Sequence, residues 1–177
     1  DIVTPWREFP ESHFFTERIT GLTPGLHYDF RVEREDCVIS PIGPTSGNFM
    51  TLHDVKVKAD YHVLWAADLG GQNFCRKKDK GYEIMRPMRE ESADLFIAAG
   101  DIIYADTGCN SDNDNIPSRI MTAKTLADFR AKYAYQFEDF GFRDFLSRVA
   151  TIATWDDHEI SDDFAGSEEA LFDVGHR

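Results

Sequence analysis

The stretches Val63–Asp68 (VLWAAD), Leu95–Asp101 (LFIAAGD) and Ala150–Asp157 (ATIATWDD) determine which fold the sequence predicts. Each is a short apolar run that ends on a carboxylate, and polar segments of helix length separate them. Such runs are typical of central strands in an α/β sheet. Because strands and helices alternate along the chain, we expect a parallel sheet with right-handed crossovers.

Three helices are expected between the apolar runs, over residues 81–92, 122–137 and 140–147. In the first, which Pro87 shortens or kinks, the residues expected to face the core are Ile84, Met88 and, as a further candidate, Met85. In the second, the apolar residues with helical spacing are Leu126, Phe129, Tyr133 and Phe137. Its N-cap is expected at Thr122 or Thr125.

The three strands should deliver acidic side chains to one edge of the sheet. Ligands of α/β sheets bind beyond the carboxyl ends of the strands. Asp68, Asp101 and the pair Asp156 and Asp157 would therefore lie close together. Crowded carboxylates repel one another unless a cation lies between them, so the sequence predicts a metal site at this edge.

The composition excludes some classes of protein. The chain has 177 residues and a net charge of −13, with 32 acidic against 19 basic residues, which argues against a broad basic surface for nucleic acid. No apolar run approaches the ~18–20 residues of a membrane span. Cys37, Cys75 and Cys109 fit neither a zinc spacing nor a disulfide-dense framework, and whether Cys75 pairs with Cys109 stays open.

Residues 1–54 predict a separate β domain. Leu26–Glu33 alternates apolar and polar residues, and Ser46–Leu52 is a second plausible strand. The turn Gly21–Gly25 and the strand after it resemble the turn that leads into one of the last strands of a fibronectin type III or immunoglobulin-like sandwich. In such a sandwich Tyr28 would form the tyrosine corner. We expect residues 1–54 to form the C-terminal part of such a sandwich and residues 55–177 a second domain, within a longer protein.

Two short motifs carry the chemistry of the second domain. In Gly100–Tyr104, glycine permits a sharp turn, Asp101 points to the edge of the sheet, and Tyr104 follows within reach of the same ion. A phenolate oxygen favours a hard ion such as Fe(III). In Trp155–Glu159, one carboxylate can bind metal while His158 donates a proton. The alternatives are a helix-capping Asp with a core Tyr, and a histidine that is hydrogen-bonded for structure.

Taken in order, these motifs resemble the alkaline phosphatase D (PhoD-like) metallophosphoesterases, relatives of the purple acid phosphatases. The resemblance rests on Trp65–Asp68, Gly100–Asp106 and Trp155–Asp163, with the last the most specific. It implies that residues 55–177 form the first half of a calcineurin-like α/β sandwich. It also implies hydrolysis of phosphate mono- or diesters by a metal-activated hydroxide at a dinuclear site, in a secreted, periplasmic or cell-surface protein.

The resemblance also implies a role for each candidate residue. Asp68 would bind the first metal, Asp101 would bridge both metals, and Tyr104 would complete the iron side. Asp157 would bind the second metal, while His158 would contact the phosphoryl group and protonate the leaving oxygen. The expected metals are Fe(III) plus Ca, Zn, Fe or Mn. The family usually has Cys in place of Asp68, and by the resemblance its other ligands come from later strands and loops, beyond Arg177. No family motif surrounds His176, which is expected to be an ordinary surface histidine.

Other functions fit part of the pattern. A non-catalytic cell-surface module that binds calcium would explain the acidic edge, and a response-regulator-like domain would explain less, because it leaves Tyr104 and His158 unused. The expected partner of an enzyme is a small phosphate ester, and the oligomeric state is not specified. Arg76 is expected to be either a clamp for substrate anions or, preferably, a surface arginine.

Overall fold

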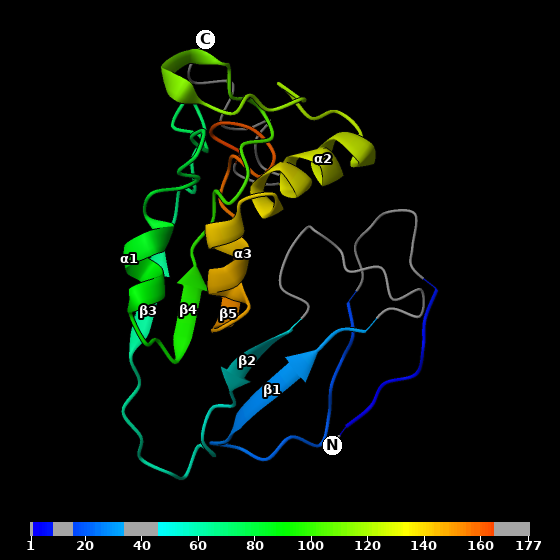
Figure 1. Cartoon of the computed structure of the whole chain (residues 1–177), viewed down its shortest axis with the longest axis vertical. Helices are drawn as coiled ribbons and strands as arrows, with labels where there is room; N and C mark the ends of the chain where they lie inside the picture. Colours follow the sequence, from blue (N-terminus) through cyan, green and yellow to red (C-terminus); the bar gives the residue numbers. More distant parts are fainter. Residues whose placement is uncertain (1, 9–15, 34–45, 165–177) are drawn as a thin grey trace.

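The computed structural model describes residues 2–8, 16–33 and 46–164, and its elements are shown in Figure 1. The strands are β1 (His27–Arg31), β2 (Ser46–Met50), β3 (Val63–Ala66), β4 (Leu95–Ala98) and β5 (Ala150–Ala153). The helices are α1 (Met85–Glu90), α2 (Leu126–Phe137) and α3 (Phe140–Leu146), with a 3₁₀ turn at Asp112–Asp114.

The three predicted apolar runs form one parallel sheet. Its strand order is β3-β4-β5, and both pairs are parallel, with Trp65 beside Ile97 and Ile97 beside Ile152. The carboxyl ends of all three strands therefore lie along the same edge of the sheet. This arrangement confirms the α/β sheet expected from the sequence.

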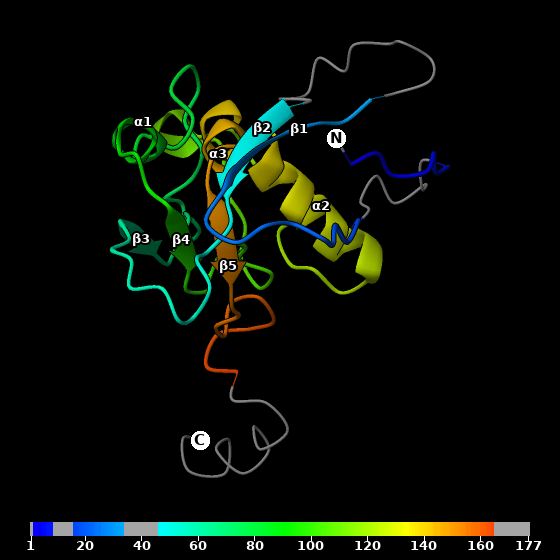
Figure 2. The ribbon, with the colours of Figure 1, turned by 90° about the horizontal axis from the view of Figure 1, so that it is seen from below.

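Helices α1 and α3 pack on the same face of this sheet, as Figure 2 shows. Phe96 of β4 meets Phe145 of α3 edge to face, with ring centroids 5.0 Å apart. Met85 and Met88 of α1 complete the core. Apolar side chains on the opposite face are open to solvent: Trp65 is 75% exposed and Ile152 is 55% exposed.

Helix α1 is shorter than expected. Residues 81–84 are not helical, because Lys77 and Gly81 form an antiparallel bridge and Gly81 has a φ of 63°. Ile84 therefore lies outside the helix and is exposed, so its expected place in the core is wrong. Met85 and Met88 are buried.

Helix α2 begins as expected and half-buries three of the four apolar residues with helical spacing, Phe129, Tyr133 and Phe137. Thr125 is the N-cap: its hydroxyl accepts a hydrogen bond from the Asp128 amide at 3.2 Å, and the Asp128 carboxylate accepts one from the Thr125 amide at 2.9 Å. The buried side chains are Lys132 and Gln136, whereas Leu126 is exposed. The apolar spacing could not show the burial of Lys132 and Gln136, because these side chains bind loop carbonyls.

The described part of residues 1–54 contains two antiparallel strands, β1 and β2. The Tyr28 hydroxyl accepts a hydrogen bond from the Thr23 amide at 2.7 Å, and the Tyr28 ring stacks on Phe49. The Asn48 amide donates to the Ser147 carbonyl at 2.8 Å, which ties β2 to the end of α3. The immunoglobulin-like sandwich stays a prediction.

Two sequence expectations lie outside the described residues, namely those for Cys37 and His176. Among the residues that the structure does describe, no helix combines the length and the apolar character needed to cross a bilayer.

Candidate metal centre

Two acidic residues follow neighbouring strands in the same unusual backbone conformation. Asp68 comes after β3 with a φ of 58°, and Asp101 comes after β4 with a φ of 53°. The Asp68 amide donates to the Gly100 carbonyl, and the Leu69 amide donates to the Asp101 carbonyl at 3.0 Å. Left-handed backbone costs most residues of order 1–2 kcal/mol but suits Asp and Asn better than others. The chain therefore turns sharply just past each strand and holds the two turns side by side.

Tyr104 points its hydroxyl at Asp68. The phenol donates a hydrogen bond to the Asp68 carboxylate at 3.0 Å. Burial, together with this hydrogen bond and the nearby carboxylates, raises the pKa of Tyr104 above its ordinary value. The ring lies against Gly71, where a Cβ atom would overlap it. Glycine at 71 is thus what lets the tyrosine reach this place.

Asp101 is a buried acid among other acids. It is 5% exposed, and its carboxylate accepts a hydrogen bond from the His158 amide at 3.2 Å. Burial is the main cause that raises the pKa of Asp101 to about 6; His158 opposes the rise, whereas the charges of Glu159 and Asp68 add to it. A nearby cation would reverse this balance by favouring the ionised carboxylate.

Asp157 joins the same cluster from the β5 side. Single ligand atoms of Asp101, Asp157 and His158 all lie within 4.8 Å of one another. Of the acidic pair that follows β5, the structure therefore brings Asp157, and not Asp156, to Asp101. Three carboxylates and a phenol are hard oxygen donors, so the residues present fit hard metal ions.

His158 is held by an acidic partner that the sequence analysis did not single out. Its Nδ1 lies 2.9 Å from the Asp106 carboxylate, and its ring stacks on Tyr104 with centroids 4.3 Å apart. Burial acts to lower the pKa of His158, but the Asp106 hydrogen bond and the charges of Asp106, Asp101 and Asp157 outweigh it and raise that pKa. The sequence signal for Asp106 was its place at the end of the Gly100–Asp106 motif, two residues after Tyr104.

Glu159 is a second residue without an expected role. It is 5% exposed, and its carboxylate accepts hydrogen bonds from the backbone amides of Asp101, Ile102 and Asp156 at 2.7–2.9 Å. The turn after β4 is therefore tied to the turn after β5. Charge-assisted hydrogen bonds of this kind are about twice as strong as neutral ones.

Arg76 is neither a surface arginine nor placed for a substrate clamp. It is 6% exposed, forms an ion pair with Glu138 at 2.8 Å, and stacks over the Tyr135 ring. Both partners belong to α2 or its C-cap, so the guanidinium fastens the loop after β3 to that helix. The expectation of a surface residue was wrong because sequence shows no sign of these distant partners.

A disulfide joins the loops that follow β3 and β4. Cys75 and Cys109 are bonded, with Cα atoms 6.0 Å apart and a sequence separation of 34. Both are buried. The structure thus answers the pairing question that the sequence left open.

Removing this disulfide should destabilise the protein. For a closed loop of this size, the chain-entropy model gives a loss of roughly 3–4 kcal/mol. We expect a Cys75→Ser/Cys109→Ser variant to unfold at lower denaturant concentration, measured by circular dichroism in urea. The unsubstituted protein should show the same decrease in its urea midpoint when a reductant is added. Equal midpoints with and without reductant would show that the disulfide does not stabilise the protein.

Comparison with known proteins gives the class of this chain. A family model described as "PhoD-like phosphatase" matches residues 64–174, well over half of the chain. The chain therefore belongs to the PhoD-like phosphatase family, as its motifs suggested. No curated protein matches it.

A solved structure has the same fold. It is titled "Structure of PhoD", and the match has a TM-score of 0.56 at 24% sequence identity. The match covers 69% of this chain and 23% of that chain, so the chain spans about a quarter of its length. At this identity the likeness shows the fold alone.

Proposed function

We propose that this chain supplies one side of a dinuclear metal centre that hydrolyses phosphate mono- or diesters. The observation that carries the proposal is that two pairs, Tyr104 with Asp68 and Asp101 with Asp157, lie just past the carboxyl ends of three parallel strands, with Asp68 close enough to Asp101 for its charge to raise the pKa of Asp101. Membership of a phosphatase family supports the reaction class.

The metal ligands that we propose divide along the edge of the sheet. Asp68 and Tyr104 would hold one ion, Asp157 the other, and the buried Asp101 would contact both. Bound cations would lower the pKa of water and neutralise phosphoryl oxygens. The phenol favours a hard trivalent ion, so Fe(III) with a divalent partner (Ca, Zn, Fe or Mn) is the pair that we propose.

His158 is the proposed proton donor to the leaving oxygen. Its Nδ1 faces the Asp106 carboxylate, so that carboxylate fixes the ring and keeps a proton on Nδ1. The hydrogen bond to the Asp106 carboxylate favours the protonated imidazole. The remaining ring nitrogen, Nε2, can then pass a proton to the departing alcohol.

The rest of the chain would support this site. We propose that residues 1–54 end a β-sandwich domain that positions the catalytic domain, which the hydrogen bond between Thr23 and Tyr28 and the contact between Asn48 and Ser147 support. The family is typically exported, which fits a buried disulfide. A small ester suits a chain with a net charge of −13 better than a polyanion does.

Metal loading and hydrolysis test the proposal together. The full-length protein, loaded with iron and a divalent ion, should hydrolyse p-nitrophenyl phosphate or bis(p-nitrophenyl) phosphate. Chelation should remove the activity, and re-loading should restore it. Iron should also give a tyrosinate charge-transfer absorption that Tyr104→Phe removes.

The same measurements separate the enzyme from a calcium-binding module. A protein that takes up calcium alone, without iron colour and without hydrolysis of either ester, would contradict the proposal. Tyr61→Phe is a matched control: the Tyr61 hydroxyl accepts a hydrogen bond from the His53 amide, away from the sheet edge, and its loss should leave the absorption unchanged.

A further inference from the structure

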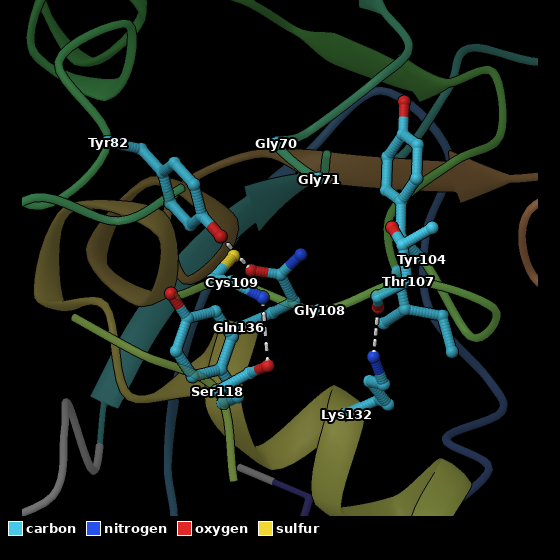
Figure 3. Close-up of a pocket in the computed structure, with 12 residues that line it drawn as sticks. Gly70, Gly71, Tyr82, Tyr104, Thr107, Gly108, Cys109, Ser118, Lys132 and Gln136 are labelled. Atoms are coloured by element: carbon cyan, nitrogen blue, oxygen red, sulfur yellow. Dashed lines mark hydrogen bonds between the residues drawn. The ribbon is translucent and has the colours of Figure 1, made fainter. Parts of the chain in front are cut away.

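Gln136 is a buried polar side chain to which the proposed chemistry gives no role. It belongs to α2 and is 4% exposed. Its Nε2 donates hydrogen bonds to the carbonyls of Leu69, at 3.1 Å, and Ile102, at 2.6 Å. Its Oε1 accepts a hydrogen bond from the Tyr82 hydroxyl, which Figure 3 shows pointing at the amide.

These partners fix the orientation of the amide. Carbonyl oxygens can only accept, so the NH₂ group must face Leu69 and Ile102, and both of its hydrogens are used. Burial raises the pKa of Tyr82, so its hydroxyl keeps the proton that it donates to Oε1. The side chain therefore has one orientation that satisfies all its neighbours.

The two carbonyls have a particular place in the chain. Leu69 directly follows Asp68, and Ile102 directly follows Asp101. One amide group thus joins the two left-handed turns, each just past a proposed metal ligand. Two backbone hydrogen bonds already join the turns, from the amides of Asp68 and Leu69, and Gln136 adds a side-chain link one residue further along each turn.

We propose that Gln136 is a positioning residue, which sets the separation of the Asp68 and Asp101 carboxylates and thereby the affinity of the metal centre. This inference rests on the proposed function. Removing one partner from a buried hydrogen bond leaves the other unsatisfied, which destabilises the arrangement that the bond held. Without the amide, the two turns would lose their common donor and could move apart to reach water.

Lys132 on the same helix offers a matched control. It is also buried, and its ammonium donates to two loop carbonyls, those of Thr107 and Met121. The Thr107 contact is drawn in Figure 3. Neither carbonyl adjoins Asp68 or Asp101. Lys132→Met therefore removes two side-chain hydrogen bonds to loop carbonyls, with a charged donor, from one turn away, without touching the link between the ligand turns.

The experiment measures metal affinity in the full-length protein for the parent, Gln136→Met and Lys132→Met. The metals are removed and titrated back against a competing chelator, and thermal unfolding is recorded for each variant. Residues that orient metal ligands typically contribute roughly 10- to 100-fold to affinity. We expect that loss in Gln136→Met, with a shifted charge-transfer band, and an affinity within about threefold of the parent in Lys132→Met.

An affinity and spectrum in Gln136→Met that match the parent, or equal losses in both variants, would overturn the inference. Should Gln136→Met not fold, Gln136→Asn decides, because it keeps the amide but is too short to reach both carbonyls. Its affinity should fall, and an unchanged value would likewise overturn the proposal. If the parent protein binds no metal, the proposed function itself is wrong. If the parent binds metal and hydrolyses the esters normally and the variants are unaffected, only the inference about Gln136 is wrong.

Discussion

Replacing Asp101 with asparagine should abolish metal loading and hydrolysis together. Asparagine keeps the shape of the side chain and an oxygen that can accept the His158 amide, so the fold should survive. What is lost is the central negative charge between Asp68 and Asp157. Residues that only orient ligands already contribute roughly 10- to 100-fold, so loss of a shared ligand should exceed about 100-fold in turnover.

Metal analysis and steady-state kinetics on the same preparation test this prediction. Asp112→Asn is the matched control, because Asp112 is an exposed carboxylate in the 3₁₀ turn and should leave both quantities unchanged. Full metal content with full activity in Asp101→Asn would show that Asp101 is no ligand, and the dinuclear proposal would then have to be abandoned.

Replacing His158 with alanine should slow turnover while the metals stay bound. General acid catalysis typically contributes 10²–10⁴-fold, so a decrease of about that size in kcat is expected. The loss should depend on the leaving group. An alkyl phosphate needs a proton on its departing oxygen, so it should suffer far more than p-nitrophenyl phosphate, whose leaving group is stable as an anion.

The leaving-group comparison also separates two roles for this histidine. His158 lies close enough to Asp101 and Asp157 to be considered as a ligand. Loss of metal in His158→Ala would indicate ligation, and an equal loss of rate for both substrates would exclude proton donation. Asp106→Asn, which keeps the shape of the partner but not its charge, should give a smaller loss in the same direction.

The parallel sheet and its acidic edge were predictable because they follow from local patterns. A short apolar run specifies a buried strand, and a parallel order specifies which edge receives the residues that come next. Asp101 and Asp157 come together as the sequence suggested, and Asp68 lies close enough to Asp101 for its charge to act on it. The strands begin at Val63, Leu95 and Ala150 as expected, and they end two to four residues before the last carboxylate of each run.

The parts of the site that were not predicted depend on contacts between distant segments. Hydrophobic spacing cannot identify Gln136 as buried, because its partners are carbonyls in loops more than thirty residues away. The same is true of Arg76, whose partner Glu138 lies in another element. Glu159 was visible in an acidic motif, but only the fold shows that it accepts backbone amides rather than metal.

The left-handed backbone at Asp68 and Asp101 narrows the choice of residues for anyone who wishes to redesign the centre. Aspartate and asparagine adopt that conformation far more readily than cysteine or a β-branched residue does. A thiolate installed at position 68 to attract softer metals would bring a conformational cost of about 1 kcal/mol with it. Altering metal preference in this scaffold is therefore easier through residues that leave the two turns untouched.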